Sequence, residues 1–149
     1  MSIIHLGKIN LQDRDTKTRS SEVTYDGRTI GLFTMVGDDP GRFDVDSKAK
    51  KKDIQAATEM ALDAGDPSLQ AHISEIFLAT EARETSLRRM KNRLRKQTLF
   101  ATPDEKVRVI ASPYCERIRS RIKKQYPEAV ILNTLSEDEA FRHYFVSTS

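Results

Sequence analysis

The chain lacks most features that would mark a secreted or membrane-embedded protein. Cys115 is its only cysteine, so no intramolecular disulfide can form. No apolar run approaches the roughly 20 residues that a membrane-spanning helix needs. The first residues, Met1 to His5, also lack the cationic and apolar regions of a secretory signal. We therefore expect a cytoplasmic protein without a membrane partner.

Metal-ligand spacing is absent as well. The chain has three scattered histidines, and none has a second histidine or a cysteine at metal-binding spacing: His5, His72 and His143. A group of aspartates could in principle collect Mg²⁺, but turn and capping roles explain it better: Asp38, Asp39, Asp44 and Asp46. We predict no metal site and no cofactor.

No catalytic motif of good specificity is present either. Cys115 and Arg121 match the Cys-x5-Arg spacing of cysteine phosphatases, but the residues between them are bulky where such a loop needs glycines. We predict instead that Cys115 is a buried, structural thiol beside Tyr114 and Ile118. No residue is assigned a catalytic role, and a small phosphate-handling or nuclease-like enzyme is the third of three functional hypotheses.

The length suits one domain. With 149 residues, of which 38% are hydrophobic and 32% charged, the chain can bury a modest core but is too short for two ordinary domains. We predict a single domain over 1–149, β-rich over 1–45, with a helical hairpin over 46–97 and a βαβ unit plus a terminal helix over 98–149.

The first third of the chain predicts an antiparallel sheet. Residues 3–11 favour a strand with a break at Gly7, and 12–21 predict a polar loop. Residues 22–25 and 28–36 flank Asp26-Gly27, a pair typical of two-residue hairpin turns. We expect Val23 to face Ile30 in this hairpin, and 42–45 to add a short strand.

Two helices follow. Asp46 or Ser47 is expected to cap a helix over 48–64 that ends at Gly65. Asp66 and Pro67 then suit the start of one long helix, about 30 residues, that runs to Gln97 without an interior glycine or proline. So short a connection favours a helical hairpin.

The last third of the chain predicts a βαβ unit. We expect a connection over 98–105, a strand over 107–111, a helix that Pro113 opens and that ends at Gln125, and a strand over 129–132. Ser136 and Glu139 fit a capping box that starts a short terminal helix. The fold class is therefore α+β.

Charge is strongly segregated along the chain. The net charge is only +3, yet residues 83–96 carry seven cations against one Glu, and 113–126 carry five against one Glu. The rest of the chain therefore sums to −7. Such an uneven distribution of charge favours an anionic partner for the basic segments, or self-association in which basic and acidic parts meet.

Arginine outnumbers lysine in the long basic helix, which fits phosphate binding better than solubility requires. The favoured hypothesis is a non-enzymatic accessory protein that binds the DNA or RNA backbone, and the candidate residues lie in both basic segments: Arg88, Arg89, Lys91, Arg93, Arg95, Lys96, Arg117, Arg119, Arg121, Lys123 and Lys124. The alternative is an adaptor or inhibitor that binds a protein partner through the long helix and is itself a homodimer, with the narrow apolar seam Leu87, Met90 and Leu94 as the interaction surface.

Overall fold

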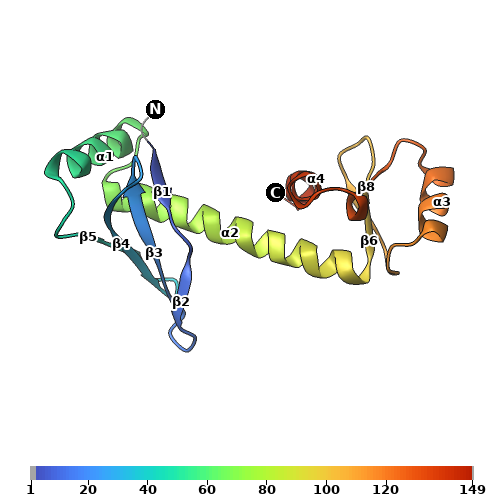
Figure 1. Cartoon of the computed structure of the whole chain (residues 1–149), viewed down its shortest axis with the longest axis horizontal. Coiled ribbons are helices and arrows are strands. Elements are labelled where there is room, and N and C mark those ends of the chain that lie inside the picture. Colours follow the sequence, from blue (N-terminus) through green and yellow to red (C-terminus); the bar gives the residue numbers. More distant parts are fainter. Residues whose placement is uncertain (1–2, 149) are drawn as a thin grey trace. The chain divides into compact units, whose positions relative to one another are not determined.

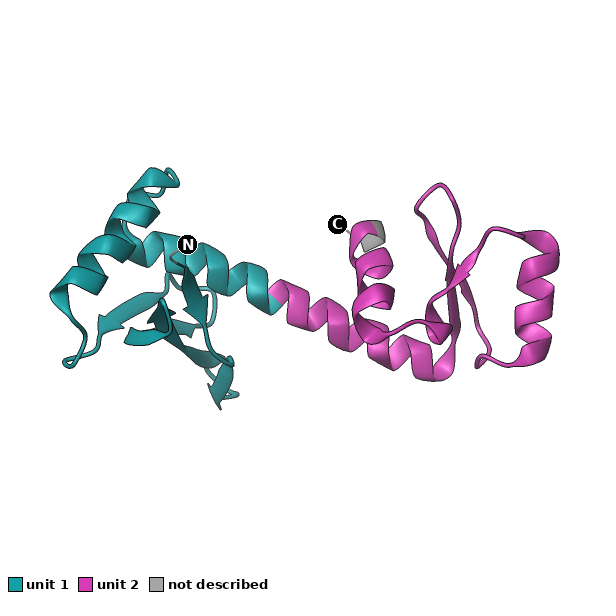
Figure 2. Ribbon diagram, turned by 45° about the horizontal axis from the view of Figure 1, so that its top comes forward, with its two compact units in different colours: residues 1–81 teal, residues 82–149 magenta. Residues whose placement is uncertain are grey.

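A computed structural model describes residues 3–148 and confirms the α+β class. The chain divides into two compact units, Met1–Glu81 (unit 1) and Ala82–Ser149 (unit 2), coloured separately in Figure 2. Helix α2 (Leu69–Lys96) contributes residues to both units. Folding of the whole chain as one domain stays a prediction. Among the described helices, none combines the length and apolar character that crossing a membrane requires.

Unit 1 is built on an antiparallel sheet (Figure 1). Its order is β1-β3-β4-β5, and β2 also pairs with β3. The strands are β1 (Ile4–Leu6), β2 (Asn10–Asp13), β3 (Thr18–Tyr25), β4 (Arg28–Val36) and β5 (Arg42–Val45). The expected break at Gly7 divides the first predicted strand, since the Gly7 amide donates to the Glu22 carbonyl at 2.8 Å between β1 and β2.

The hairpin around Asp26-Gly27 is confirmed. Both turn residues have positive φ, 50° and 80°, and Tyr25 pairs with Arg28. The expected pairing of Val23 with Ile30 is wrong: Val23 pairs with Gly31, because a register shift follows Val23.

The predicted loop over 12–21 is wrong at both ends, because Gln12 and Asp13 belong to β2. Thr18 to Ser21 belong to β3 and pair with β4. These residues are polar and show no hydrophobic periodicity, so the sequence does not mark them as a strand. Hydrogen bonds allow their polar groups to be buried in the sheet. The hydroxyl of the buried Ser21, for example, donates to the Gly7 carbonyl at 2.9 Å.

The helices of unit 1 begin later than predicted. Helix α1 spans Lys51–Asp63, and its N-cap is Lys50, without a side-chain cap bond. Asp46 is not the cap, because it accepts from the Lys48 amide at 2.8 Å within the preceding turn. Ser68, rather than Asp66, accepts from the first turn of α2, through the Ala71 amide at 3.1 Å. The Asp66 carboxylate instead lies 2.6 Å from the His72 ring.

Both helices pack on the sheet of unit 1. Phe33 from β4, Ala57 from α1 and Ile73 and Phe77 from α2 are fully buried in one core cluster. Two arginines join the sheet to the helices. Arg19 donates twice to Glu81 of α2 at 2.7 Å. Arg28 donates twice to Asp53 of α1, at 2.8 and 2.9 Å.

Unit 2 contains a second, three-stranded sheet in the order β7-β6-β8. Its elements are β6 (Thr98–Ala101), β7 (Val107–Ile110), α3 (Glu116–Gln125), β8 (Val130–Ile131), η1 (Leu132–Thr134) and α4 (Glu137–Thr148). The predicted strand–helix–strand order is present. The connection predicted over 98–105 is wrong, because Thr98 to Ala101 form the central strand and pair antiparallel with both neighbours. Strands β7 and β8 therefore run in the same direction, with β6 between them.

Helices cover both faces of this sheet. Successive residues of β6 point to opposite faces. Leu99 packs with Met90 of α2 and Phe141 of α4. Phe100 packs with Ile122 of α3 and Ile131. The C-terminal half of α2 and helix α4 thus lie on one face, and α3 lies on the other.

Asn133 joins the end of α2 to the sheet. Its side-chain amide donates to the Leu94 and Gln97 carbonyls at 3.1 and 3.0 Å. Its side-chain oxygen accepts from the Leu99 amide at 2.9 Å. One side chain thus satisfies two carbonyls that the end of the helix leaves without an intrahelical partner. Its third hydrogen bond, from the Leu99 amide, fixes the position of β6 relative to the end of α2.

Replacing Asn133 by Ala should lower the free energy of unfolding by about 2 kcal/mol, because three buried or half-buried backbone groups lose their partner. Chemical denaturation monitored by circular dichroism measures this. Asn10→Ala is the matched control, since within residues 3–148 the exposed Asn10 side chain makes one long hydrogen bond, 3.4 Å to the Lys8 carbonyl. Equal stability of the two variants would contradict the role given to Asn133.

The Arg28–Asp53 pair predicts a dependence of stability on pH. The hydrogen bonds from Arg28 lower the pKa of the Asp53 carboxyl below its ordinary value, although its burial opposes this. A lowered folded-state pKa contributes stability above the ordinary pKa of about 3.9, and this stability is lost as the pH falls through the lowered value.

Asp53→Asn should therefore lower the urea midpoint at neutral pH, and its difference from the wild type should shrink below about pH 4. Asp39→Asn, in an exposed turn, is the control. A difference that stays constant down to acid pH would show that the Asp53 charge contributes nothing.

Candidate nucleic-acid interface

The seam of α2 determines where its basic side chains lie. Met90 is fully buried, and Leu87 and Leu94 pack beside it in the cluster with α4 and η1. All seven cations between Arg83 and Lys96 are exposed. The apolar seam predicted for a partner is therefore covered by the chain itself. A role of the seam in self-association stays a prediction.

Three cations of this segment have a neighbour within unit 2. Lys91 Nζ lies 3.1 Å from a Glu137 carboxylate oxygen, with both side chains half-exposed. The Arg83 guanidinium lies 5.2 Å from the centre of the Phe141 ring. Arg95 donates to the side chain of Asn92.

The side chains of the other four cations make no ion pair or hydrogen bond with any residue in 3–148: Arg88, Arg89, Arg93 and Lys96. We call these four residues the α2 surface. Like charges three and four positions apart repel on a helix, so this arrangement costs stability unless an anion neutralises it.

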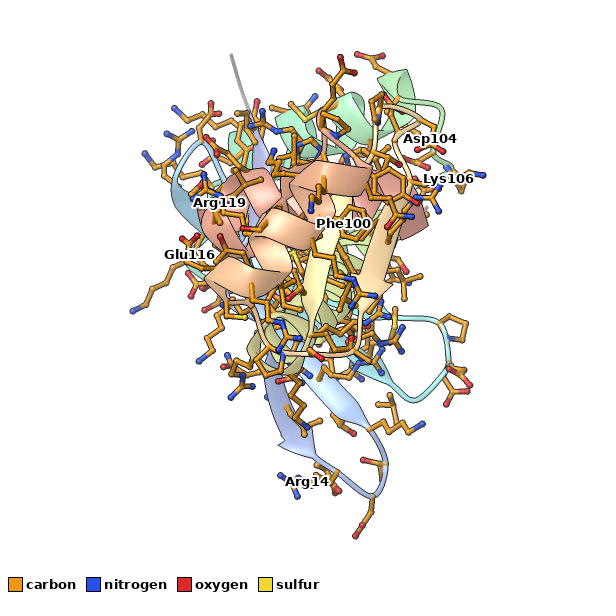
Figure 3. All side chains as sticks on the ribbon, turned by 90° about the vertical axis from the view of Figure 1, so that its right-hand side faces the viewer. Arg14, Phe100, Asp104, Lys106, Glu116 and Arg119 are labelled. Atoms are coloured by element: carbon orange, nitrogen blue, oxygen red, sulfur yellow. The ribbon has the colours of Figure 1, made fainter. Side chains whose placement is uncertain are left out.

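Helix α3 presents a second basic set. Arg119 lies 3.6 Å from Glu116, and the Lys123 ammonium donates to the Ala129 carbonyl at 2.5 Å. Three cations are exposed and have no partner in the described part of the chain, and we call them the α3 surface: Arg117, Arg121 and Lys124. Figure 3 looks onto this helix, with Glu116 and Arg119 on its outer side and Phe100 behind it.

The prediction of a buried Cys115 is wrong. The thiol is exposed, because α3 begins at Glu116 and Cys115 is its N-cap residue, with extended backbone. The segment after β7 turns first: the Ser112 amide donates to the Ile110 carbonyl at 2.8 Å, and the Thr98 hydroxyl donates to the Ser112 carbonyl at 2.9 Å. Pro113 therefore precedes the helix instead of opening it.

The eleven predicted residues lie on two helices that pack on opposite faces of one sheet. The α2 surface belongs to a helix on one face of the β7-β6-β8 sheet, and the α3 surface belongs to the helix on the other face. Figure 2 shows α3 on the far side of the strands from α4 and the end of α2. A single short segment of a partner cannot lie along both helices at once.

The charge segregation coincides with the division into units. Unit 2 carries 15 basic and 8 acidic residues, a net charge of +7, whereas unit 1 carries 10 basic and 14 acidic residues, a net charge of −4. The arginines of unit 1 are mostly paired: Arg19 with Glu81, Arg28 with Asp53, and Arg42 with Asp44 at 3.0 Å. Arginines without an ion pair in the described residues are thus concentrated in unit 2.

A cleft of about 420 Å³ lies beside α3, and most of its lining residues were not singled out by the sequence. Arg108 of β7, Arg121 of α3 and Tyr126 contribute to its walls. The pattern Val107-Arg108-Val109 marks an exposed position on a strand, but only the fold brings Arg108 beside Tyr126. No sequence signal connects these two positions.

Within 3–148, no group of three or more His, Cys, Asp or Glu side chains is placed to hold a metal ion.

Comparisons of the chain with protein-family models, with curated proteins and with solved structures found no match. The function is therefore argued from the arrangement of its own residues.

Proposed function

We propose that the protein is a non-enzymatic, cytoplasmic accessory protein that binds the phosphate backbone of nucleic acid through the α2 surface, with help from the α3 surface. The observation that carries the proposal is the contrast between the units: arginines of unit 1 are mostly paired with carboxylates, while those of the α2 surface are exposed and unpaired. Exposed guanidiniums bind phosphate oxygens in a bidentate geometry.

The geometry also supports binding without base specificity. The unpaired cations lie on the solvent side of a helix whose other side is fixed by Met90 in the core. Contacts of exposed cations with phosphates supply affinity and register but do not read sequence. Such binding releases counterions and becomes weaker as salt rises.

Reversing three charges of the α2 surface, Arg89, Arg93 and Lys96→Glu, should abolish binding to a short duplex in a fluorescence anisotropy titration. These side chains make no bond within the described part of the chain, so the fold should survive. The neutral triple Arg89, Arg93 and Lys96→Gln should reduce the slope of log K against log salt by about 2.7, since each phosphate contact contributes about 0.9.

The control has the same change in charge at another place. Lys48, Lys51 and Lys52 are exposed cations of unit 1, and their replacement by Glu should leave binding within about threefold, because only long-range electrostatics change. Undiminished binding by the α2 triple variant, or an equal loss with the unit 1 control, would contradict the proposal. The triple Arg117, Arg121 and Lys124→Gln measures the contribution of the α3 surface separately.

A further inference from the structure

A second feature of unit 2 has the form of a ligand site. The cleft of about 420 Å³ lies between helix α3 and strand β7, an edge strand of the β7-β6-β8 sheet. Phe100 is directly opposite Arg108 in the strand pairing, and both line the cleft on the α3 side of the sheet. We call this the β7 cleft. Its volume is in the range of pockets that hold small organic groups.

The floor of the β7 cleft is apolar and aromatic. Phe100 and Ile122 are buried, and Ile110 is half-buried beside them. The half-buried Tyr126 packs against Phe100, with the ring centres 5.4 Å apart and the ring planes inclined by 43°. A flat, apolar group that enters the cleft would therefore meet an aromatic surface.

Cations and an amide surround this floor. The Arg108 guanidinium lies 5.3 Å from the centre of the Tyr126 ring, and its nearest carboxylate, Asp104, is 3.9 Å away with both side chains half-exposed. Arg121 has no partner in 3–148. The Gln125 side chain is exposed and supplies both a donor and an acceptor.

We propose that the β7 cleft binds one unstacked nucleotide of single-stranded nucleic acid. The base packs against Tyr126 and the Arg108 guanidinium, Gln125 hydrogen-bonds to the base edge, and Arg121 binds the adjacent phosphate. This inference rests on the proposed function and extends it by naming the strandedness of the ligand. Aromatic rings and guanidinium planes bind splayed bases in this manner.

The chemistry of the cleft favours a nucleotide over an acidic peptide. The carboxylates of an acidic peptide would pair with Arg108 and Arg121 but would not stack on the aromatic floor of the cleft. A nucleotide fills both parts, because it joins an anionic phosphate to a planar base. In a duplex the bases are stacked and paired, so a duplex could reach the arginines but not the floor.

The test compares single-stranded and duplex forms of one labelled oligonucleotide, titrated with the full chain. Tyr126→Leu keeps an apolar side chain but removes the ring. It should weaken single-strand binding about five- to 150-fold, the range for loss of one stacked base, and change duplex binding less than about twofold. Tyr114→Leu is the control: Tyr114 belongs to the same core cluster but does not line the cleft.

Arg121→Gln gives a second test of single-strand binding, and it replaces a side chain that does not pack in the core. This exposed, unpaired side chain can be replaced without loss of a bond within the described residues. Its replacement should reduce the single-strand slope of log K against log salt by about 0.7. The control Arg14→Gln, an exposed cation of unit 1, should leave that slope unchanged.

The outcomes separate the two proposals. If the wild type binds neither the single strand nor the duplex, the proposed function fails and this inference fails with it. If the wild type binds both, but Tyr126→Leu weakens both equally or neither, or acts no more strongly than Tyr114→Leu, only the β7 cleft is excluded. If circular dichroism shows that Tyr126→Leu is unfolded, Arg121→Gln decides, and an unchanged slope overturns the inference.

Discussion

The burial of Met90 is the constraint on which the candidate interface depends. Met90 is fully buried against the sheet of unit 2, and Leu87 and Leu94 pack on either side of it. Because each residue of a helix turns about 100°, these contacts set the direction of every other side chain in that half of α2. Arg89 and Lys96 then point about 130–150° away from the seam. The packing of the seam thus sets the exposure of Arg89 and Lys96, although neither side chain bonds to the core.

The same geometry explains which basic residues have partners. Arg83 lies within about 20° of the seam direction, and its guanidinium is accordingly over the Phe141 ring. Lys91 lies about 70° from the seam, near α4, where it pairs with Glu137. The cations further round the helix make no ion pair within the described residues. Because only the narrow apolar seam of α2 packs against unit 2, the cations on the rest of this helix are exposed and mostly unpaired.

Features set by neighbouring residues could be predicted from the sequence. Asp26-Gly27 specified its turn. The spacing of Leu87, Met90 and Leu94 marked an apolar seam on α2, but the sequence assigned that seam to a partner, whereas residues of unit 2 pack against it. Strand β6 could not be recognised, because its four residues are all buried and show no alternation. The division of the basic residues into two surfaces, and the approach of Arg108 to Tyr126, depend on strand pairings between distant residues. No local pattern encodes them.

The salt dependence of binding by the wild-type chain tests the central claim most directly. A duplex titrated at several salt concentrations should be bound most tightly at low salt, and log K should fall linearly with log salt. The slope should reach about −3 to −4 if the four cations of the α2 surface each contact one phosphate, at about 0.9 per contact. Absence of binding at low ionic strength, or an affinity independent of salt, would contradict the assignment of this surface to nucleic-acid phosphate.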